Sequence, residues 1–178
     1  MHYQMKNVHS KLLLLMGLVF LLSSCSTSRK TSSRSNGAGK ASSSRTTTKS
    51  GKLRNSIATY AGRFTGTKYQ YGGGTPKGFD CSGLTHYVFD EFNIELPRGS
   101  YNQAKIGKRI SLNKTKPGDL VFFGKRGKVN HVALVVKNSS AGVEVIHSTS
   151  SRGVMKQNIS KSTYWKPRIL FARDVMHR

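Results

Sequence analysis

The chain has few cysteines, no clustered metal ligands and no apolar run long enough to cross a membrane. Only two of its 178 residues are cysteine, Cys25 and Cys81, and neither a CxxC nor an HxxxH spacing occurs. Because a metal site needs clustered thiolate and imidazole ligands, we expect no metal and no other cofactor. The apolar run of residues 12–22 is about half the length that a helix needs to span a bilayer, which argues against a membrane-spanning anchor.

The N-terminal residues are typical of an export signal. Lys6 and Lys11 precede the apolar run and small residues follow it, a pattern that a core helix would not explain. The segment LSSC, which ends at Cys25, resembles a bacterial lipobox, in which the cysteine is lipidated and becomes the first residue of the mature protein. An ordinary secretory signal is the alternative. We therefore expect a lipoprotein signal peptide over residues 1–24.

Acidic and aromatic residues are absent from the segment that follows. From Ser26 to about Gly51 the chain is nearly all Ser, Thr, Gly, Lys and Arg. Such a segment cannot bury enough apolar surface to offset the entropy lost on ordering. We expect residues 25–52 to be a lipidated cysteine with a disordered basic linker, and residues 53–178 to be one folded domain.

The charge of the chain is strongly one-sided. Thirty Lys and Arg face seven acidic residues, the formal net charge is +23, and every acid lies at or beyond Asp80. Nucleic acid is a common partner of such a protein, but an export signal argues against it. We expect the anionic cell envelope as the partner instead: a membrane surface, reached through lipidated Cys25 and the basic linker, or the carboxylates of peptidoglycan stem peptides. No feature predicts an oligomer, so a monomer is expected.

The pattern of residues 53–178 predicts an α+β fold. Apolar residues at helical spacing predict a first helix, Asp80 is placed to cap a second one from Cys81 to about Phe92, and Ser100 and Gln103 have capping-box spacing for a short third one through Ile106. The later part of the chain predicts strands at 119–123, 131–136, 143–148 and 168–175. Helices followed by neighbouring strands favour helices packed on a largely antiparallel sheet.

Cys81 is the candidate nucleophile. If Cys25 carries lipid, Cys81 is an unpaired thiol in an exported protein. At a helix start, unpaired N–H groups and the helix dipole favour the thiolate and can receive an oxyanion. Small Ser82 and Gly83 leave room for a substrate. A buried structural cysteine is the alternative interpretation.

Two histidines can complete a catalytic site. With the turn placed at residues 137–142 and Val135 facing Val143, His131 lies directly opposite His147 on one face of a hairpin, with Cβ atoms roughly 4.5–5.5 Å apart. That face could pack against the cysteine helix, whereas a register slip of one residue would separate the two rings. The combination predicts a triad in which Cys81 attacks, His131 moves the proton and His147 orients His131.

Five segments, in this order, resemble the signature of the NlpC family of papain-like cell-wall endopeptidases. They are KYQYGGGTPKGFDCSGLTHYVF, LPRGSYNQ, KPGDLVFF, VNHVALVV and VIHSTS. The lipobox and the basic linker are similar to those of Spr-type lipoproteins of Gram-negative bacteria. Because Ser26 and not Asp follows Cys25, this likeness implies a lipid anchor in the outer membrane, facing the periplasm.

The resemblance implies roles for individual residues. Cys81 is the nucleophile, His131 the base and His147 the third polar residue, and the hydroxyl of Tyr69 points at the oxyanion or the substrate. It also implies that a substrate groove is lined by Asp80, Ser82, Arg98 and Ser100, although Asp80 is also a helix cap and Arg98 could simply brace a loop. The implied fold is papain-like. The implied reaction is hydrolysis of a D-γ-glutamyl–diamino acid bond or a D,D cross-link in peptidoglycan stem peptides.

Two other functions fit parts of the sequence. A basic, non-catalytic lipoprotein could bind the anionic envelope, but it would not need a thiol set beside two imidazoles and a phenol. A thiol acyltransferase would use the same residues and pass the acyl group to an amine.

Overall fold

The computed structural model describes residues 41–177, with side chains from Lys49 onward. The expected signal peptide, Cys25 and residues 26–40 of the expected linker lie outside the described residues.

The first helix, α1 (Ala41–Gly62), begins earlier than the sequence predicts. Its apolar spacing is confirmed, because Ile57, Ala58 and Ala61 are buried. Residues 41–52, however, are helical, so the prediction of disorder does not hold for this part of the linker. Once the packed turns have formed, each further residue adds one hydrogen bond without a new nucleus, and this favours extension toward the N-terminus. No helix within residues 41–177 is long and apolar enough to cross a bilayer.

The second helix, α2 (Cys81–Asp90), starts where the sequence predicts. Asp80 is its N-cap, and the carboxylate accepts a 2.6 Å hydrogen bond from the backbone N–H of Gly83. A cap of this kind satisfies one of the donors that a helix start leaves unpaired. The cap thereby fixes Cys81 at the first helical position.

The short helix α3 (Ser100–Gln103) does not have the predicted capping box. Gly99, with φ of 84°, precedes the helix, and Ser100 lies inside it without a side-chain cap. The wholly buried Gln103 points inward instead, where its amide donates to the carbonyls of Ser82 and Pro97. Gln103 therefore ties α3 to the first turn of α2. Because its amide is used in these hydrogen bonds, it is not available for the predicted capping box with Ser100.

A glycine-rich hairpin approaches the start of α2. It consists of β1 (Gly74–Thr75) and β2 (Gly78–Phe79), which pair antiparallel. A Cβ atom on Gly83 would lie 1.9 Å from the carbonyl oxygen of Gly73, so no larger residue fits there. Gly83 is small because the hairpin backbone packs against it, and not to leave room for a substrate as the sequence suggested.

Six strands form one antiparallel sheet in the order β3-β8-β4-β5-β6-β7. Helices packed on a largely antiparallel sheet confirm the predicted fold class. The two strands β3 and β7 are absent from the prediction, and two 3-10 turns, η1 (Leu112–Lys114) and η2 (Lys166–Arg168), interrupt the chain. The strands are β3 (Lys108–Ile110), β4 (Leu120–Lys125), β5 (Lys128–Ser139), β6 (Gly142–Thr149), β7 (Gly153–Asn158) and β8 (Ile169–Asp174).

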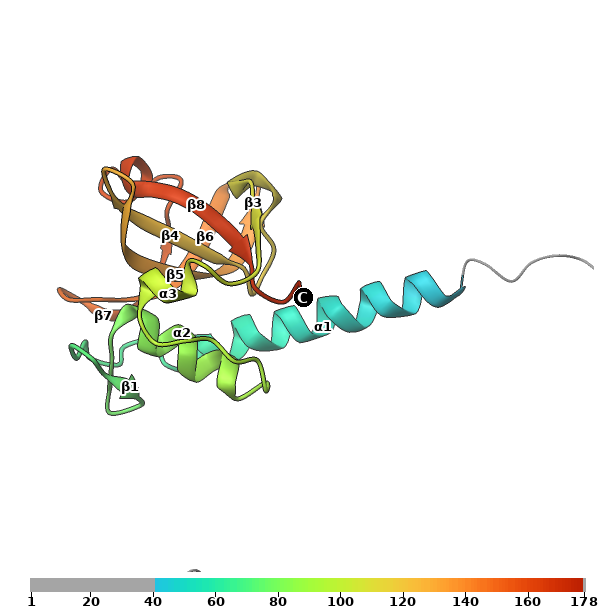
Figure 1. Ribbon diagram of the computed structural model, residues 1–178, viewed down its shortest axis with the longest axis horizontal. Helices are drawn as coiled ribbons and strands as arrows, with labels where there is room; N and C mark the ends of the chain where they lie inside the picture. The colour runs from blue at the N-terminus through green and yellow to red at the C-terminus, as the bar shows by residue number, and fades with distance from the viewer. Residues whose placement is uncertain (1–40, 178) are drawn as a thin grey trace, which may run out of the picture. The chain divides into compact units, whose positions relative to one another are not determined.

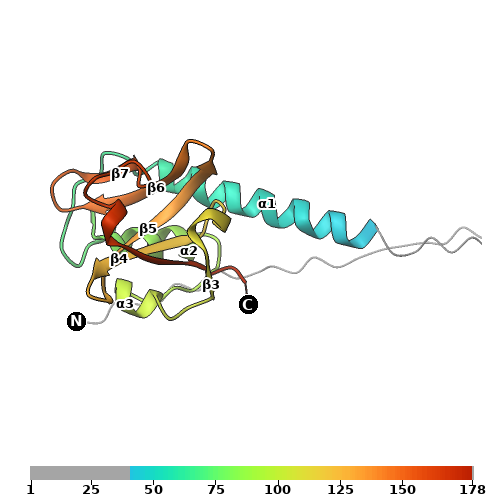
Figure 2. The same ribbon diagram turned by 90° about the horizontal axis from the view of Figure 1, so that it is seen from above.

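Side chains alternate between two hydrophobic clusters, one on each face of the sheet. Val132 and Leu134 of β5 pack with Leu84 and Val88 of α2 in the first cluster. Figures 1 and 2 both show α2 lying against β5 on this face. The second cluster contains Ala133, Val135, Val143 and Val145, together with residues of β4 and β8. The second cluster is therefore on the face away from α2.

The hairpin β5–β6 differs from the predicted one in three ways. Its turn is only Ser140 and Ala141, because Ser139 pairs with Gly142. A bulge between Val135 and Lys137 then shifts the register, so that Val135 pairs with Val145 and not with Val143. In that register His131 is two residues away from lying directly opposite His147, so the predicted direct opposition is wrong. The predicted packing of this face on α2 is also wrong.

The bulge nevertheless keeps both histidines on one face. Between the turn and the bulge, Ser139 pairs with Gly142, whereas beyond the bulge Val135 pairs with Val145. The bulge therefore shifts the pairing of the two strands by one residue. Side chains alternate along a strand, so without the extra residue His131 and His147 would point to opposite faces. The shared face was predicted correctly, but the bulge that produces it was not.

A buried ion-pair network joins α1 to the sheet. The guanidinium of Arg54 donates to Asp119, 2.6 Å away, and to Asp174 in β8, 2.7 Å away. It also donates to the carbonyl of Pro117 at 3.2 Å. Both Arg54 and Asp119 are buried. The guanidinium of Arg54 thus joins α1 to the segment 117–119 and to the end of β8, which are distant in sequence.

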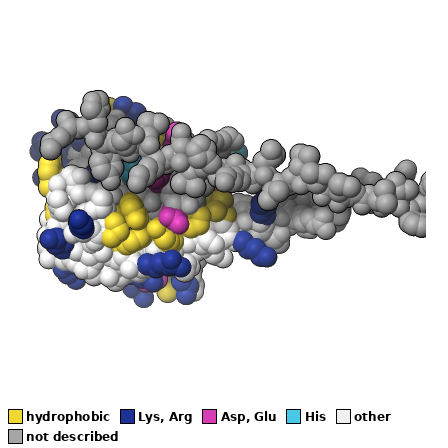
Figure 3. Space-filling model, turned by 90° about the horizontal axis from the view of Figure 1, so that it is seen from below, with side chains coloured by type: hydrophobic (Ala, Val, Ile, Leu, Met, Phe, Trp, Pro, Cys, Tyr) yellow, Lys and Arg dark blue, Asp and Glu magenta, His cyan; other side chains and the backbone are white. Residues whose placement is uncertain are grey.

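The folded domain shares the basic character of the chain. Figure 3 shows Lys and Arg side chains spread around a patch of hydrophobic side chains, with few acidic side chains on this face. Three ion pairs occur among the described side chains, formed by Arg54 with two aspartates and by Arg98 with Asp80. Most of the positive charge of the domain therefore faces solvent or a partner.

Candidate active site

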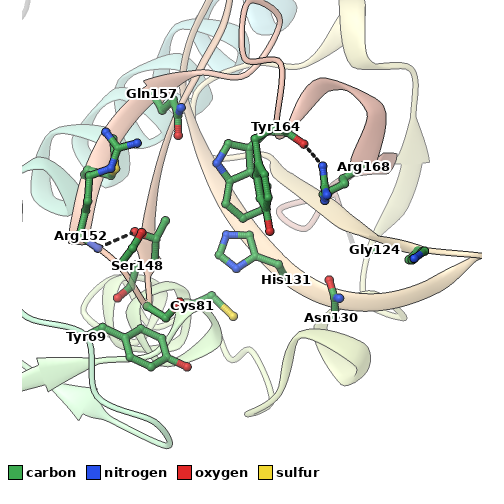
Figure 4. A pocket seen from close by; sticks show the side chains of 16 residues that line it. Tyr69, Cys81, Gly124, Asn130, His131, Ser148, Arg152, Gln157, Tyr164 and Arg168 are labelled. Carbon is green, nitrogen blue, oxygen red and sulfur yellow. Dashed lines mark hydrogen bonds between the residues drawn. The ribbon is translucent and has the colours of Figure 1, made fainter.

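Cys81 and His131 line the same cavity, which has a volume of about 590 Å³. Tyr69, Ser148 and Trp165 line it as well. Figure 4 shows the thiol of Cys81, the ring of His131 and the phenol of Tyr69 side by side at this cavity. The cavity is within the size range of sites that take small molecules or peptide fragments.

The start of α2 supplies the thiol together with backbone donors. Cys81 is a free cysteine, partly exposed to the cavity. Backbone N–H groups of Val132, Ser82 and Cys81 itself surround the sulfur. Since the first N–H groups of a helix have no partner within it, the same donors can stabilise negative charge that develops on a carbonyl oxygen beside the sulfur.

The two imidazoles are hydrogen-bonded to each other. Nε2 of His131 lies 3.0 Å from Nδ1 of His147. Because Nε2 of His131 is engaged, Nδ1 is the nitrogen that remains for the thiol of Cys81. The structure therefore brings together the three residues predicted as a triad, and their catalytic roles stay predictions.

Aromatic rings hold the plane of His131. The indole of Trp165 stacks on it, with centroids 4.5 Å apart and planes 26° apart. Phe123 contacts it at 5.6 Å and His147 at 5.2 Å between ring centroids. These rings close the end of the second hydrophobic cluster. A base packed in this way has little freedom to rotate away from the thiol.

Burial keeps the resting pair neutral. It raises the pKa of the Cys81 thiol above its ordinary value, and the surrounding N–H groups offset only part of that effect. It also lowers the pKa of His131 to about 3, with a further contribution from neighbouring His147, whose own pKa burial lowers to about 4. At this sulfur desolvation outweighs the helix dipole, so burial favours the thiol over the thiolate that a helix start alone would favour.

The pH dependence of thiol alkylation tests this protonation state. A thiol with a raised pKa forms thiolate only above that pKa, so the rate of reaction of Cys81 with iodoacetamide should keep rising beyond about pH 8.5, the ordinary thiol pKa. The measurement uses Cys25→Ala protein, in which Cys81 is the one remaining cysteine, with free cysteine as the reference. A rate plateau that extended below pH 6 would report a thiolate–imidazolium pair and contradict this description.

Tyr69 lies beside Cys81 at the cavity, and the role of its hydroxyl stays a prediction. It forms an isolated bridge with Phe79, directly before the start of α2. Burial raises the pKa of its phenol, and repulsion from Cys81, once that thiol ionises, and from Asp80 adds to the shift. The hydroxyl therefore stays protonated at neutral pH and can donate a hydrogen bond to an oxyanion.

The other four predicted groove residues are not among the residues that line this cavity. The carboxylate of Asp80 accepts from Ser82 at 2.9 Å and from Arg98 at 3.0 Å. Arg98 also donates to the carbonyl of Gly72 at 3.1 Å. Asp80, Ser82 and Arg98 thus form one network that holds the glycine-rich hairpin against α2, and Ser100 follows in α3. A contact of these four residues with a substrate stays a prediction.

Trp165, Gln157 and Ser148 are site residues that the sequence analysis missed. Ser148 donates to the carbonyl of Phe79 at 2.7 Å and so ties β6 to the segment before Cys81. Trp165 is the one tryptophan of the chain, a signal that could have drawn attention to it. Gln157 lies in β7, a strand that was not predicted. None of the three could be placed at the site without the fold.

Comparisons with known proteins agree with this geometry. The chain is 41% identical over 124 residues to a gamma-DL-glutamyl hydrolase of Bacillus subtilis, with 67% of this chain and 29% of that protein covered. It is 37% identical over 114 residues to the murein DD-endopeptidase MepS/murein LD-carboxypeptidase of Escherichia coli, with 64% and 58% covered. The chain thus spans less than two thirds of either relative.

The fold is also similar to that of solved structures. The NlpC/p60 domain of the peptidoglycan hydrolase SagA matches with a TM-score of 0.59 and 29% identity, over 68% of this chain and 97% of that one. The family model described as the NlpC/P60 family matches residues 66–174, more than half of the chain, and this range includes the thiol, both imidazoles and the phenol. The chain therefore belongs to the NlpC/P60 family.

Proposed function

We propose that the chain is a cysteine peptidase that hydrolyses peptide bonds in the stem peptides of peptidoglycan. The observation that carries the proposal is the contact of His131 Nε2 with His147 Nδ1, at 3.0 Å, beside a free thiol in the same cavity. Membership in the NlpC/P60 family, and the printed names of the relatives, support a cell-wall substrate.

The first half of the reaction forms an acyl-enzyme. As the sulfur of Cys81 adds to the scissile carbonyl carbon, its proton moves to Nδ1 of His131, so that no free thiolate is needed in the resting enzyme. The oxyanion receives hydrogen bonds from the backbone at Cys81 and from the hydroxyl of Tyr69. Nδ1 of His131 then gives its proton to the leaving nitrogen, the C–N bond breaks, and a thioester remains on Cys81.

The second half returns the enzyme to its starting state. A water molecule gives one proton to Nδ1 of His131 and adds to the thioester carbonyl. The C–S bond then breaks, and the same proton returns to the sulfur of Cys81. Throughout, Nδ1 of His147 accepts from Nε2–H of His131 and stabilises the imidazolium, the role that an aspartate has in other triads.

Digestion of purified peptidoglycan tests the proposal and identifies the bond. The untreated protein should release fragments whose new amino termini, measured by mass spectrometry, are either the diamino acid of a stem or the amine freed from a D,D cross-link. Protein alkylated at Cys81 with iodoacetamide is the matched control. Equal fragment profiles from both samples would refute the hydrolase, whereas new amide products with an added amine would indicate acyl transfer.

We further propose that the protein is anchored to the outer membrane through lipid on Cys25. The support is the sequence LSSC behind an apolar run, together with the basic segment after it. Replacing Cys25 with alanine should move the protein from the membrane fraction to the soluble periplasmic fraction, because lipid chains supply the anchoring energy. Immunoblots of the two fractions measure this, with Ser26→Ala as the control. Retention of Cys25→Ala protein in membranes would disprove the anchor.

A further inference from the structure

His147 has a ring nitrogen for which the fold supplies no hydrogen-bond partner. The residue is wholly buried, its Nδ1 faces His131, and its Nε2 makes no hydrogen bond of normal geometry, although Gln157 lies near enough to act on the ring and raise its pKa. Buried polar atoms are almost always paired, because leaving one unpaired costs free energy. We therefore expect a neighbouring polar side chain to form a hydrogen bond with Nε2 of His147 when the site is active.

Gln157 is the polar side chain placed to do so. In the β6–β7 register, His147 pairs with Met155 and Val145 pairs with Gln157, so Gln157 is the diagonal neighbour of His147 on the same face. Diagonal neighbours are within reach of long side chains. The carboxamide of Gln157 also lines the catalytic cavity, where Figure 4 shows it on the far side of His131 from Cys81.

The proton transfer from Cys81 to His131 determines the direction of the hydrogen bonds that follow, from His131 to His147 and from His147 to its next partner. If the thiol of Cys81 gives its proton to Nδ1 of His131, then Nε2 of His131 carries the proton and donates to Nδ1 of His147. A neutral His147 must then carry its own proton on Nε2. What Nε2–H of His147 needs is an acceptor, and Oε1 of Gln157 is one.

Ser162 orients the carboxamide accordingly. Nε2 of Gln157 donates to Oγ of Ser162 at 3.5 Å. The same oxygen accepts from the backbone N–H of Trp165 at 3.1 Å. With its amide nitrogen directed to Ser162, Gln157 has its carbonyl oxygen left for His147. Ser162 thus places both Gln157 and the indole that stacks on His131.

We propose that Gln157 is a positioning residue of the catalytic site, which accepts a hydrogen bond from Nε2–H of His147 and so fixes the tautomer that makes His131 a base toward Cys81. The inference rests on the proposed function. It extends the triad by a fourth member that acts through His147 and does not touch the substrate.

Replacing Gln157 with methionine removes the acceptor oxygen Oε1 while keeping the length of the side chain nearly constant. We expect kcat to fall roughly tenfold with KM nearly unchanged, because the missing hydrogen bond orients the base and does not bind substrate. Lys156→Met is the matched control, since Lys156 is the adjacent residue, exposed on the opposite face of β7. An unchanged kcat in Gln157→Met protein would overturn the proposal.

Replacing Gln157 with glutamate gives a pH signature that a merely structural role would not give. A carboxylate at this place raises the pKa of His147, which also faces His131, Arg152 and Trp165. Once doubly protonated, His147 can no longer accept from His131. The acid limb of the kcat/KM profile should therefore move to higher pH, with activity recovering toward that of the natural protein in alkaline solution. A profile with no shift would contradict the proposal.

Histidine tautomers can be read without any activity. In protein labelled with 15N-histidine, long-range 1H–15N spectra should show His147 protonated on Nε2 and not on Nδ1, and Gln157→Met should weaken this preference or speed exchange of the Nε2 proton. A Nδ1-protonated His147 in the natural protein would overturn the inference even if the enzyme is active. Conversely, the expected tautomer in a protein that does not digest peptidoglycan would leave the inference standing and refute the proposed function.

Discussion

Cys81→Ala protein should digest peptidoglycan at least about a thousandfold more slowly than the natural protein, because removal of a nucleophile stops the covalent step while leaving only binding and oxyanion stabilisation. The loss should appear in kcat, since the thiol contributes little to substrate binding. Release of soluble fragments from labelled peptidoglycan measures both quantities. The three residues act as a unit, so a Cys81→Ala and His131→Ala double variant should be hardly slower than Cys81→Ala alone.

The fold should survive this substitution. Cys81 is partly exposed to the cavity, and the cap formed by Asp80 with Gly83 does not involve the thiol. The midpoint of urea unfolding should therefore stay close to that of the natural protein, which separates loss of chemistry from loss of structure. Digestion by Cys81→Ala protein at a tenth or more of the natural rate would refute a thiol nucleophile.

Arg54→Ala should destabilise the domain by about 3–5 kcal/mol, because removing one member of a buried ion pair leaves the other charge without compensation. Asp119 is 1% exposed and would remain in place without its guanidinium partner. The free energy of unfolding in urea measures the effect. Lys52→Ala is the matched control, since it removes the same charge from an exposed position of α1. A loss below about 1 kcal/mol would show that the network is not a main support of the helix.

The loss of unfolding free energy caused by Arg54→Ala should be smaller in acid. Burial raises the pKa of Asp119, and the hydrogen bonds from Lys116 and Arg54 oppose this shift. Without Arg54 the pKa rises further. A carboxyl with a higher pKa in the folded state than in the unfolded state binds its proton more tightly when folded, so the folded state gains stability as the pH falls. The difference between Arg54→Ala and the natural protein should therefore be smaller at pH 5 than at pH 8.

Local signals in the sequence predicted the start of α2, four of the strands and the thiol, imidazoles and phenol that meet at the site, but not Trp165, Gln157 or Ser148. Asp80 is a helix cap within three residues of its partner, and strands β4, β5, β6 and β8 are rich in apolar residues. Strand β7 was missed because half of its six residues are polar. The short β3 was missed because KRI carries almost no strand pattern, and its pairing with β8 depends on the tertiary fold.

The geometry around His131 shows where prediction from sequence stops. The predicted hairpin had a six-residue turn and no bulge, and it placed both histidines on one face. The hairpin of the structure has a two-residue turn and a bulge at Val136, and it also places both histidines on one face. Backbone irregularities of this kind have no strong composition signal. The face of the sheet that α2 covers, and the stacking of Trp165 on His131, depend on contacts between distant segments and could not be derived from spacing.

The protonated state of the resting thiol has a consequence for the durability of the protein under oxidising conditions. Oxidants attack thiolate far faster than thiol, and the first product, a sulfenic acid, can go on to irreversible forms. The burial that raises the pKa of Cys81 thus keeps its sulfur in the slowly oxidised form until a substrate carbonyl arrives. With no second cysteine among residues 41–177 to resolve an oxidised sulfur, that protection preserves the working lifetime of each molecule.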